Sequence, residues 1–241
     1  MEVHSQMYVY VPSAETVQEH WKEAKEDPEE IFHFTSDLEI FIRLIDDSPE
    51  TANEKIPEVL GPISHLHPLI AAIEALRQWK INDGSYQHAK AAKHLLHDSL
   101  QRGLENNHDS IIVSSLQELI PLQAKLNHDY SEELSTAVDY LFDRYYEEEK
   151  GPRTGFKETV DLVLEHVDSD DPSGQGLLQL LFVVCIVRAN KYSQQDGELG
   201  ENVMDQDSCR EFLEKAVEVG KALNIDDTGL KRRYAEEYPL C

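Results

Sequence analysis

The chain has 241 residues, of which 40% are hydrophobic, and it contains only 11 glycines and 10 prolines. This composition is typical of a helix-rich globular protein and excludes collagen-like and low-complexity chains. The 47 acidic residues outnumber the 22 basic ones, and the formal net charge of −25 makes the chain as a whole repel nucleic-acid phosphates. Direct nucleic-acid binding is therefore not expected. Halophilic adaptation, an ordinary solvated surface and imitation of DNA remain as explanations of the acidity.

The three cysteines, Cys185, Cys209 and Cys241, are an odd number without paired spacing. They imply neither a disulfide framework nor a Cys-based zinc site, and a reducing compartment is expected. The first residues of the chain contain neither the basic region nor the apolar region of a secretory signal. We therefore expect a cytoplasmic protein that does not associate with a membrane.

The N-terminal part of the chain predicts a short arm and two helices. Residues 7–12 alternate weakly between apolar and polar side chains, which indicates an extended N-terminal arm. Ser13 is the predicted N-cap of the first helix. An aspartate followed by a proline in residues 27–30 predicts the start of the second helix, which is expected to end within residues 46–49. Three prolines in residues 50–68 predict no more than one or two short helical turns.

Three helices are predicted between residues 69 and 122, because apolar side chains recur three and four positions apart. The first is expected to end at residues 82–84. Ser85 is the predicted N-cap of the second, and Gly103 is expected to end it. Asp109 opens the third. Each of these helices is expected to bury one apolar face.

A further helix is predicted from Ser131, and the acidic stretch that ends it contains the predicted domain boundary. Residues 1–150 are expected to form an N-terminal helical subdomain, and residues 151–241 a C-terminal one. The two subdomains are also compatible with one continuous domain.

The C-terminal subdomain is expected to pack around the helix of residues 177–187, the longest apolar run of the chain. This helix is predicted to begin after residues 172–176 and to be covered on every side, because apolar surface is favoured away from water. It is shorter than the about 20 apolar residues that span a bilayer. A capping-box pattern beginning at Ser208 predicts the last long helix, and Asn224 is its expected end.

About ten helices joined by short turns, with almost no alternation of period two, predict an all-α fold. Successive antiparallel helices of this kind form either an orthogonal bundle or an irregular α-solenoid. The sequence contains no repeat of fixed period that would decide between them.

Histidines supply the candidate metal ligands of the chain. His94 and His97 lie three residues apart on one predicted helix and share a face. The His97–Asp98 pair, with His65 or His67 upstream and Asp129 or Asp139 downstream, resembles the ligand set of HD-type phosphohydrolases. That resemblance implies a metal ion that activates water for attack on a phosphate ester. Residues 99–100 depart from the family, which has glycine and lysine there. The candidate ligands are His65, His67, His94, His97 and Asp98.

A second enzyme family is suggested by Arg102 and His108. An arginine, five intervening residues and a histidine resemble the motif of HEPN ribonucleases, which are also helical. The resemblance implies RNA cleavage by these two side chains. Gly103 stands where the family usually has a polar residue, and the stretch between Arg102 and His108 is predicted to be a loop.

The motifs G-x-G-x-x-G, G-x-x-x-x-G-K-[ST], G-x-S-x-G and H-E-x-x-H are absent from the sequence. We therefore assign no catalytic residue and expect no cofactor. The first hypothesis is an acidic, all-helical interaction or scaffold module with a protein partner. The alternatives are an HD-like metal-dependent phosphohydrolase, an acidic DNA-mimic inhibitor and a HEPN-like ribonuclease.

Overall fold

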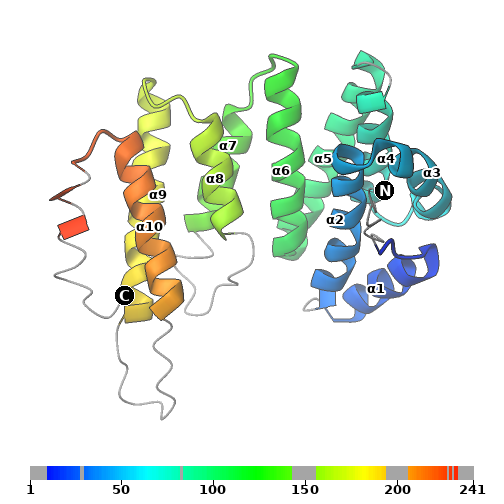
Figure 1. Ribbon diagram of the computed structural model, residues 1–241, viewed down its shortest axis with the longest axis horizontal. Helices are drawn as coiled ribbons and strands as arrows, with labels where there is room; N and C mark the ends of the chain where they lie inside the picture. The colour runs from blue at the N-terminus through cyan, green and yellow to red at the C-terminus, as the bar shows by residue number, and fades with distance from the viewer. Residues whose placement is uncertain are drawn as a thin grey trace, which may run out of the picture. The chain divides into compact units, whose positions relative to one another are not determined.

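The computed structural model describes residues 10–27, 30–81, 84–142, 156–193, 206–226, 228, 229, 231 and 232. Their regular structure consists of ten α-helices and one short 3-10 helix, with no strand among these residues (Figure 1). The predicted all-α class is therefore confirmed. The predicted N-terminal arm lies mostly outside the described residues.

The chain divides into two compact units, residues 1–122 and residues 123–241. This division lies near the end of α6 (Asp109–Lys125) and thus inside the predicted N-terminal subdomain. The predicted boundary after residue 150 falls in a segment outside the described residues.

Unit 1 is built from helices that pack on their neighbours along the chain. Helix α1 packs on α2, α2 on α3 and α4, and α4 on α5, while the Ser115 hydroxyl donates a hydrogen bond of 2.9 Å to Ser99 between α6 and α5. The predicted N-cap is present, because the Ser13 hydroxyl accepts a 3.2 Å hydrogen bond from the Thr16 amide. The remaining elements are α1 (Ala14–Glu26), α2 (Ile31–Asp47), α3 (Pro49–Val59), the 3-10 helix η2 (Gly61–Ile63), α4 (Pro68–Ile81) and α5 (Tyr86–Asn106).

Two predictions for unit 1 are wrong. Helix α3 has 11 residues and contains Pro57 in its last turn, where proline removes a single backbone hydrogen bond. Helix α5 does not end at Gly103 but continues to Asn106. A Cβ atom at Gly103 would lie 2.9 Å from Ile112 Cγ1 and 3.2 Å from Ile111 Cγ2, so this glycine permits close packing of α5 on α6.

In the part of unit 2 that the structure describes, four long helices each pack on two others. Helix α7 packs on α8 and α9, and α10 packs on the same two helices; Figure 1 shows α9 beside α10. Rings of Phe156 and Phe212 join α8 to α10 with centroids 4.5 Å apart. The buried Lys215 ammonium forms ion pairs with Asp161 and Glu218. The bounds are α7 (Ser131–Phe142), α8 (Phe156–His166), α9 (Pro172–Ser193) and α10 (Gln206–Ala222).

Helix α9 contains the predicted apolar helix but differs from it in two respects. It begins at Pro172, because Asp171 accepts hydrogen bonds from the amides of its first turn. It is also not covered on every side by the described residues, since Val183 remains 43% exposed. Residues 172–190, with a mean hydropathy of 1.4, are long and apolar enough to cross a membrane by length and composition alone. This is weak evidence, because core helices share these properties.

Helix α10 begins at Gln206, so Ser208 lies within the helix rather than at its predicted N-cap. Asn224, the predicted end, adopts a left-handed conformation with φ of 58° just after the helix. Asparagine tolerates this conformation better than most residues and is a common helix terminator. The sequence also suggests a final short helix over residues 229–238, and most of these residues lie outside the described ones.

Candidate functional site

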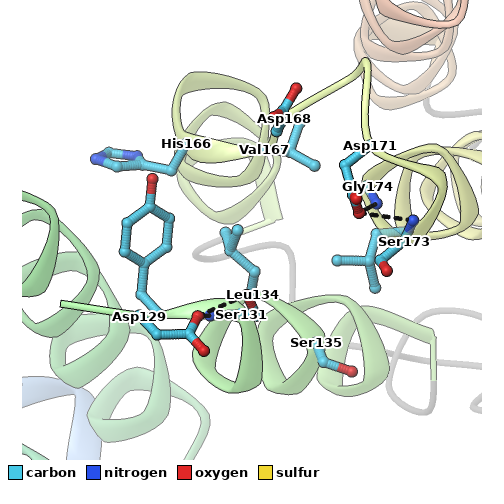
Figure 2. Close-up of a pocket in the computed structure, with 12 residues that line it drawn as sticks. Asp129, Ser131, Leu134, Ser135, His166, Val167, Asp168, Asp171, Ser173 and Gly174 are labelled. Carbon is cyan, nitrogen blue, oxygen red and sulfur yellow. Dashed lines mark hydrogen bonds between the residues drawn. The ribbon is translucent and has the colours of Figure 1, made fainter. Parts of the chain in front are cut away.

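A pocket of about 740 Å³ lies in unit 2, between the start of α7 and the loop that connects α8 to α9 (Figure 2). This volume is within the range of about 300–1,000 Å³ that is usual for ligand sites. Three aspartates line it together with hydroxyl groups, apolar side chains and one histidine. The lining residues are Asp129, Tyr130, Ser131, Leu134, Ser135, His166, Val167, Asp168, Asp171, Ser173, Gly174 and Leu177.

Asp129 organises the start of α7. Its Oδ1 atom accepts a hydrogen bond of 3.0 Å from the Ser131 amide and one of 2.7 Å from the Ser131 hydroxyl. An aspartate that binds the backbone two residues further on forms a stable turn before a helix. The next residue, Tyr130, meets the His166 ring edge-to-face, with centroids 6.0 Å apart and planes at 89°. Local turn chemistry and this aromatic contact thus fix one end of the pocket.

His166 ends α8, and its orientation is set by the backbone. Its Nδ1 atom lies 3.0 Å from the carbonyl oxygen of Leu162. Because a carbonyl only accepts hydrogen bonds, Nδ1 carries the proton in this contact.

Asp171 organises the start of α9 at the other end of the pocket. Its Oδ2 atom accepts hydrogen bonds of 2.8 Å and 3.3 Å from the amides of Ser173 and Gly174. Hydrogen bonds from the Ser173 side chain, and then from these two amides, hold the pKa of Asp171 below its ordinary value. The carboxylate is therefore negatively charged at neutral pH.

Gly174 allows α9 to approach the α8–α9 loop closely. A Cβ atom at this position would lie 1.9 Å from the carbonyl oxygen of Asp168 and 3.1 Å from Val167 Cγ2. Any larger residue would push the first turn of α9 away from the loop that lines the pocket. By contrast, a Cβ atom at Gly176 in the same helix would meet nothing within 4 Å.

The pocket has a net negative field. Asp129, Asp168 and Asp171 contribute three carboxylates, and among the described residues neither lysine nor arginine lines the pocket. The N-termini of α7 and α9 oppose this charge, but each is equivalent to only about half a positive charge. The three carboxylates of the described lining therefore outweigh the two helix dipoles.

The five candidate metal ligands lie in unit 1, in different surroundings. His65 and His94 are exposed, while His97 is partly exposed. Asp98 accepts a hydrogen bond of 3.3 Å from Arg102. Within the part of the chain that the structure describes, no three or more histidine, cysteine, aspartate or glutamate side chains are grouped so as to hold a metal ion.

His67 is buried, with 3% of its surface exposed. Its ring lies edge-to-face against Trp21 and Phe34, at centroid distances of 4.9 Å and 5.8 Å. Its Nδ1 atom accepts a hydrogen bond of 3.2 Å from the Leu69 amide. Burial, followed by the charges of Arg102 and His108, lowers the pKa of His67 to about 3. The neutral imidazole therefore serves as a packed core side chain at neutral pH.

The segment between Arg102 and His108, the two residues of the HEPN-like motif, was predicted to be a loop, and this prediction is wrong. Helix α5 continues through Arg102 to Asn106, so the residues that follow the arginine are helical and not a loop. His108 precedes α6, and burial lowers the pKa of His108 below its ordinary value.

Of the two described cysteines, Cys209 differs from the expectation and Cys185 does not. Cys185 is a buried free thiol in α9, and burial raises the pKa of its thiol well above the usual range. Cys209 is disulfide-bonded, although the sequence spacing implied no disulfide.

Sequence reasoning did not find the pocket, because its lining comes from two separate stretches, 129–135 and 166–177. The available signals were local: in each stretch an aspartate stands two residues before a serine at a helix start. Such signals identify helix starts, but they do not reveal that two starts share one cavity. Comparisons with protein-family models, with curated proteins and with solved structures found no significant match.

Proposed function

We propose that this protein is an acidic, all-helical interaction module that binds a basic segment of a protein partner in the pocket of unit 2. The observation that carries the proposal is the lining of this pocket, in which the described residues include three aspartates and neither lysine nor arginine. A cation that enters it meets a net negative field even after the helix dipoles are counted.

The charge of the whole chain supports the same partner. A net charge of −25 attracts basic proteins over a Debye length of about 8 Å at physiological salt and raises the rate of encounter. Long-range attraction alone is not selective, whereas a cavity with apolar and hydroxyl groups beside the carboxylates supplies specific contacts. The DNA-mimic hypothesis is one form of this proposal, in which the partner's basic surface normally binds nucleic acid.

Selection from a random heptapeptide library displayed on phage, at 0.15 M salt, tests the proposal without assuming a sequence. The enriched peptides should be rich in arginine and lysine, and their binding should weaken at 0.5 M salt because charges are screened. Enrichment of acidic or uncharged peptides would contradict the proposal. So would the absence of any enrichment over an uncoated surface.

A further inference from the structure

We infer that unit 1 binds a zinc ion between His20 of α1 and His33 of α2, with these two imidazoles as its protein ligands. Both residues belong to unit 1, whereas the pocket belongs to unit 2, so the inference is independent of the proposed function. It rests on the separation of the two rings and on the carboxylate that each ring contacts.

The two imidazole rings lie close together where α1 packs on α2. Their centroids are 5.5 Å apart and their planes meet at 37°. Zinc binds an imidazole nitrogen at about 2.0–2.1 Å, so two rings that share one ion at about the tetrahedral angle have centroids about 5 Å apart. The observed separation is therefore close to that of two histidines bound to the same ion.

Each ring contacts a carboxylate through one of its nitrogens. His20 Nδ1 lies 2.7 Å from Asp37 Oδ2, and His33 Nε2 lies 3.3 Å from Glu30 Oε2. Because a carboxylate only accepts hydrogen bonds, the proton of a neutral ring is favoured on the nitrogen that faces it. The other two nitrogens, His20 Nε2 and His33 Nδ1, then carry the lone pairs that an ion needs.

This pattern is common around histidine ligands of metal ions. A ligating histidine usually donates its second N–H to a carboxylate or a carbonyl, which fixes the tautomer and the orientation of the ring. Asp37 is buried in α2, so it holds the His20 ring of α1 against the helix that carries His33. An ordinary ion pair between the helices explains the contact of His20 with Asp37, but it does not explain a second histidine–carboxylate pair beside it.

The proposed site is open to solvent. The side chain of His20 is 28% exposed and that of His33 is 56% exposed, so water can take the remaining coordination positions. Within the described part of the chain, no group of three or more ligand side chains is formed, and the ion is therefore expected to exchange rather than to be a closed structural centre. Imidazole ligands favour zinc over magnesium and calcium, which prefer oxygen.

The test is isothermal titration calorimetry of the full chain with zinc chloride, with magnesium chloride as the comparison ion. His33→Ala removes one ligand, and the exposure of this side chain makes the variant compatible with folding. Glu30→Ala leaves both ligands in place and removes one outer carboxylate; no hydrogen bond from the Glu30 side chain caps α2. The matched control is His94→Ala, which removes an exposed histidine of α5 in the same unit.

The wild type and His94→Ala should bind one zinc ion with equal affinity and should not bind magnesium. Glu30→Ala should bind zinc about tenfold more weakly, as expected for the loss of an outer partner, and His33→Ala should lose at least as much. Zinc should also shift the ring nitrogen signals of His20 and His33 in ¹⁵N NMR spectra of the wild type, a measurement that needs no variant.

Equal zinc affinity in the wild type, His33→Ala and His94→Ala would mean an adventitious ion only and would overturn the inference. Ring signals that shift at other histidines and not at His20 and His33 would overturn it as well. Weakening in His33→Ala without any change in Glu30→Ala would contradict the role of the outer carboxylate.

Discussion

Replacing Gly174 by alanine should destabilise unit 2, whereas the same replacement at Gly176 should stabilise it. At Gly174 the new Cβ atom would lie 1.9 Å from a backbone carbonyl oxygen, and real Cβ atoms essentially never approach closer than 3.0 Å. The first turn of α9 must therefore move by about 1 Å or more relative to the α8–α9 loop. Overpacking of this kind costs about 1–3 kcal/mol, and the upper part of this range is expected because backbone, unlike a side chain, cannot rotate away.

The two glycines share a helix, which makes them a matched pair. Alanine is favoured over glycine in a helix by about 0.5–1 kcal/mol, so Gly174→Ala should lower the free energy of unfolding by about 1–2 kcal/mol in total. Gly176→Ala meets nothing within 4 Å and should raise it by up to about 1 kcal/mol. Urea denaturation followed by far-UV circular dichroism measures both changes. A Gly174→Ala variant as stable as Gly176→Ala would refute the close approach of α9 to the loop.

Two further predictions concern the buried His67 and the cysteines. The pKa of His67 is lowered to about 3 in the folded chain, whereas it is about 6.5 in the unfolded chain. The neutral form of His67 therefore stabilises the fold above pH 6.5, and this stabilisation is lost as the pH falls towards 3. Between pH 7 and pH 5 the free energy of unfolding should fall by about 2 kcal/mol. Urea denaturation followed by tryptophan fluorescence measures this change, since both tryptophans belong to unit 1. A His67→Asn variant whose stability depends on pH in the same way would contradict the prediction. With Cys209 disulfide-bonded and Cys185 free, thiol titration of the denatured, unreduced protein should report fewer free thiols than the three cysteines of the sequence. A count of three would show that the disulfide is absent.

The helices that the sequence predicted well are those whose ends carry a local chemical signal. Ser13 caps α1 and Asn224 follows α10, because side-chain capping and left-handed backbone are properties of single residues. Gly103 was wrongly predicted to end α5, because the sequence alone does not distinguish a glycine that ends a helix from one that allows a neighbouring helix to pack closely. Only the position of Ile112 distinguishes them.

The site was less predictable than the fold for a related reason. The apolar run 177–187 suggested a helix that begins after residue 176, but the hydrogen bonds of Asp171 start α9 at Pro172 and place this turn in the pocket wall. The pocket depends on packing between α7 and the α8–α9 loop, which no spacing along the chain encodes. His67 was named as a metal candidate from its residue type, and its burial against Trp21 became visible only in three dimensions.

The most direct test of the central claim, that the pocket of unit 2 binds a basic segment, is an amide NMR titration of the ¹⁵N-labelled protein with an arginine- and lysine-rich heptapeptide from the phage selection. The largest shift changes should occur at the two helix starts that line the pocket, at the amides of Ser131, Ser173 and Gly174, and they should saturate. Changes of similar size spread over acidic residues of both units, or confined to unit 1, would contradict the claim.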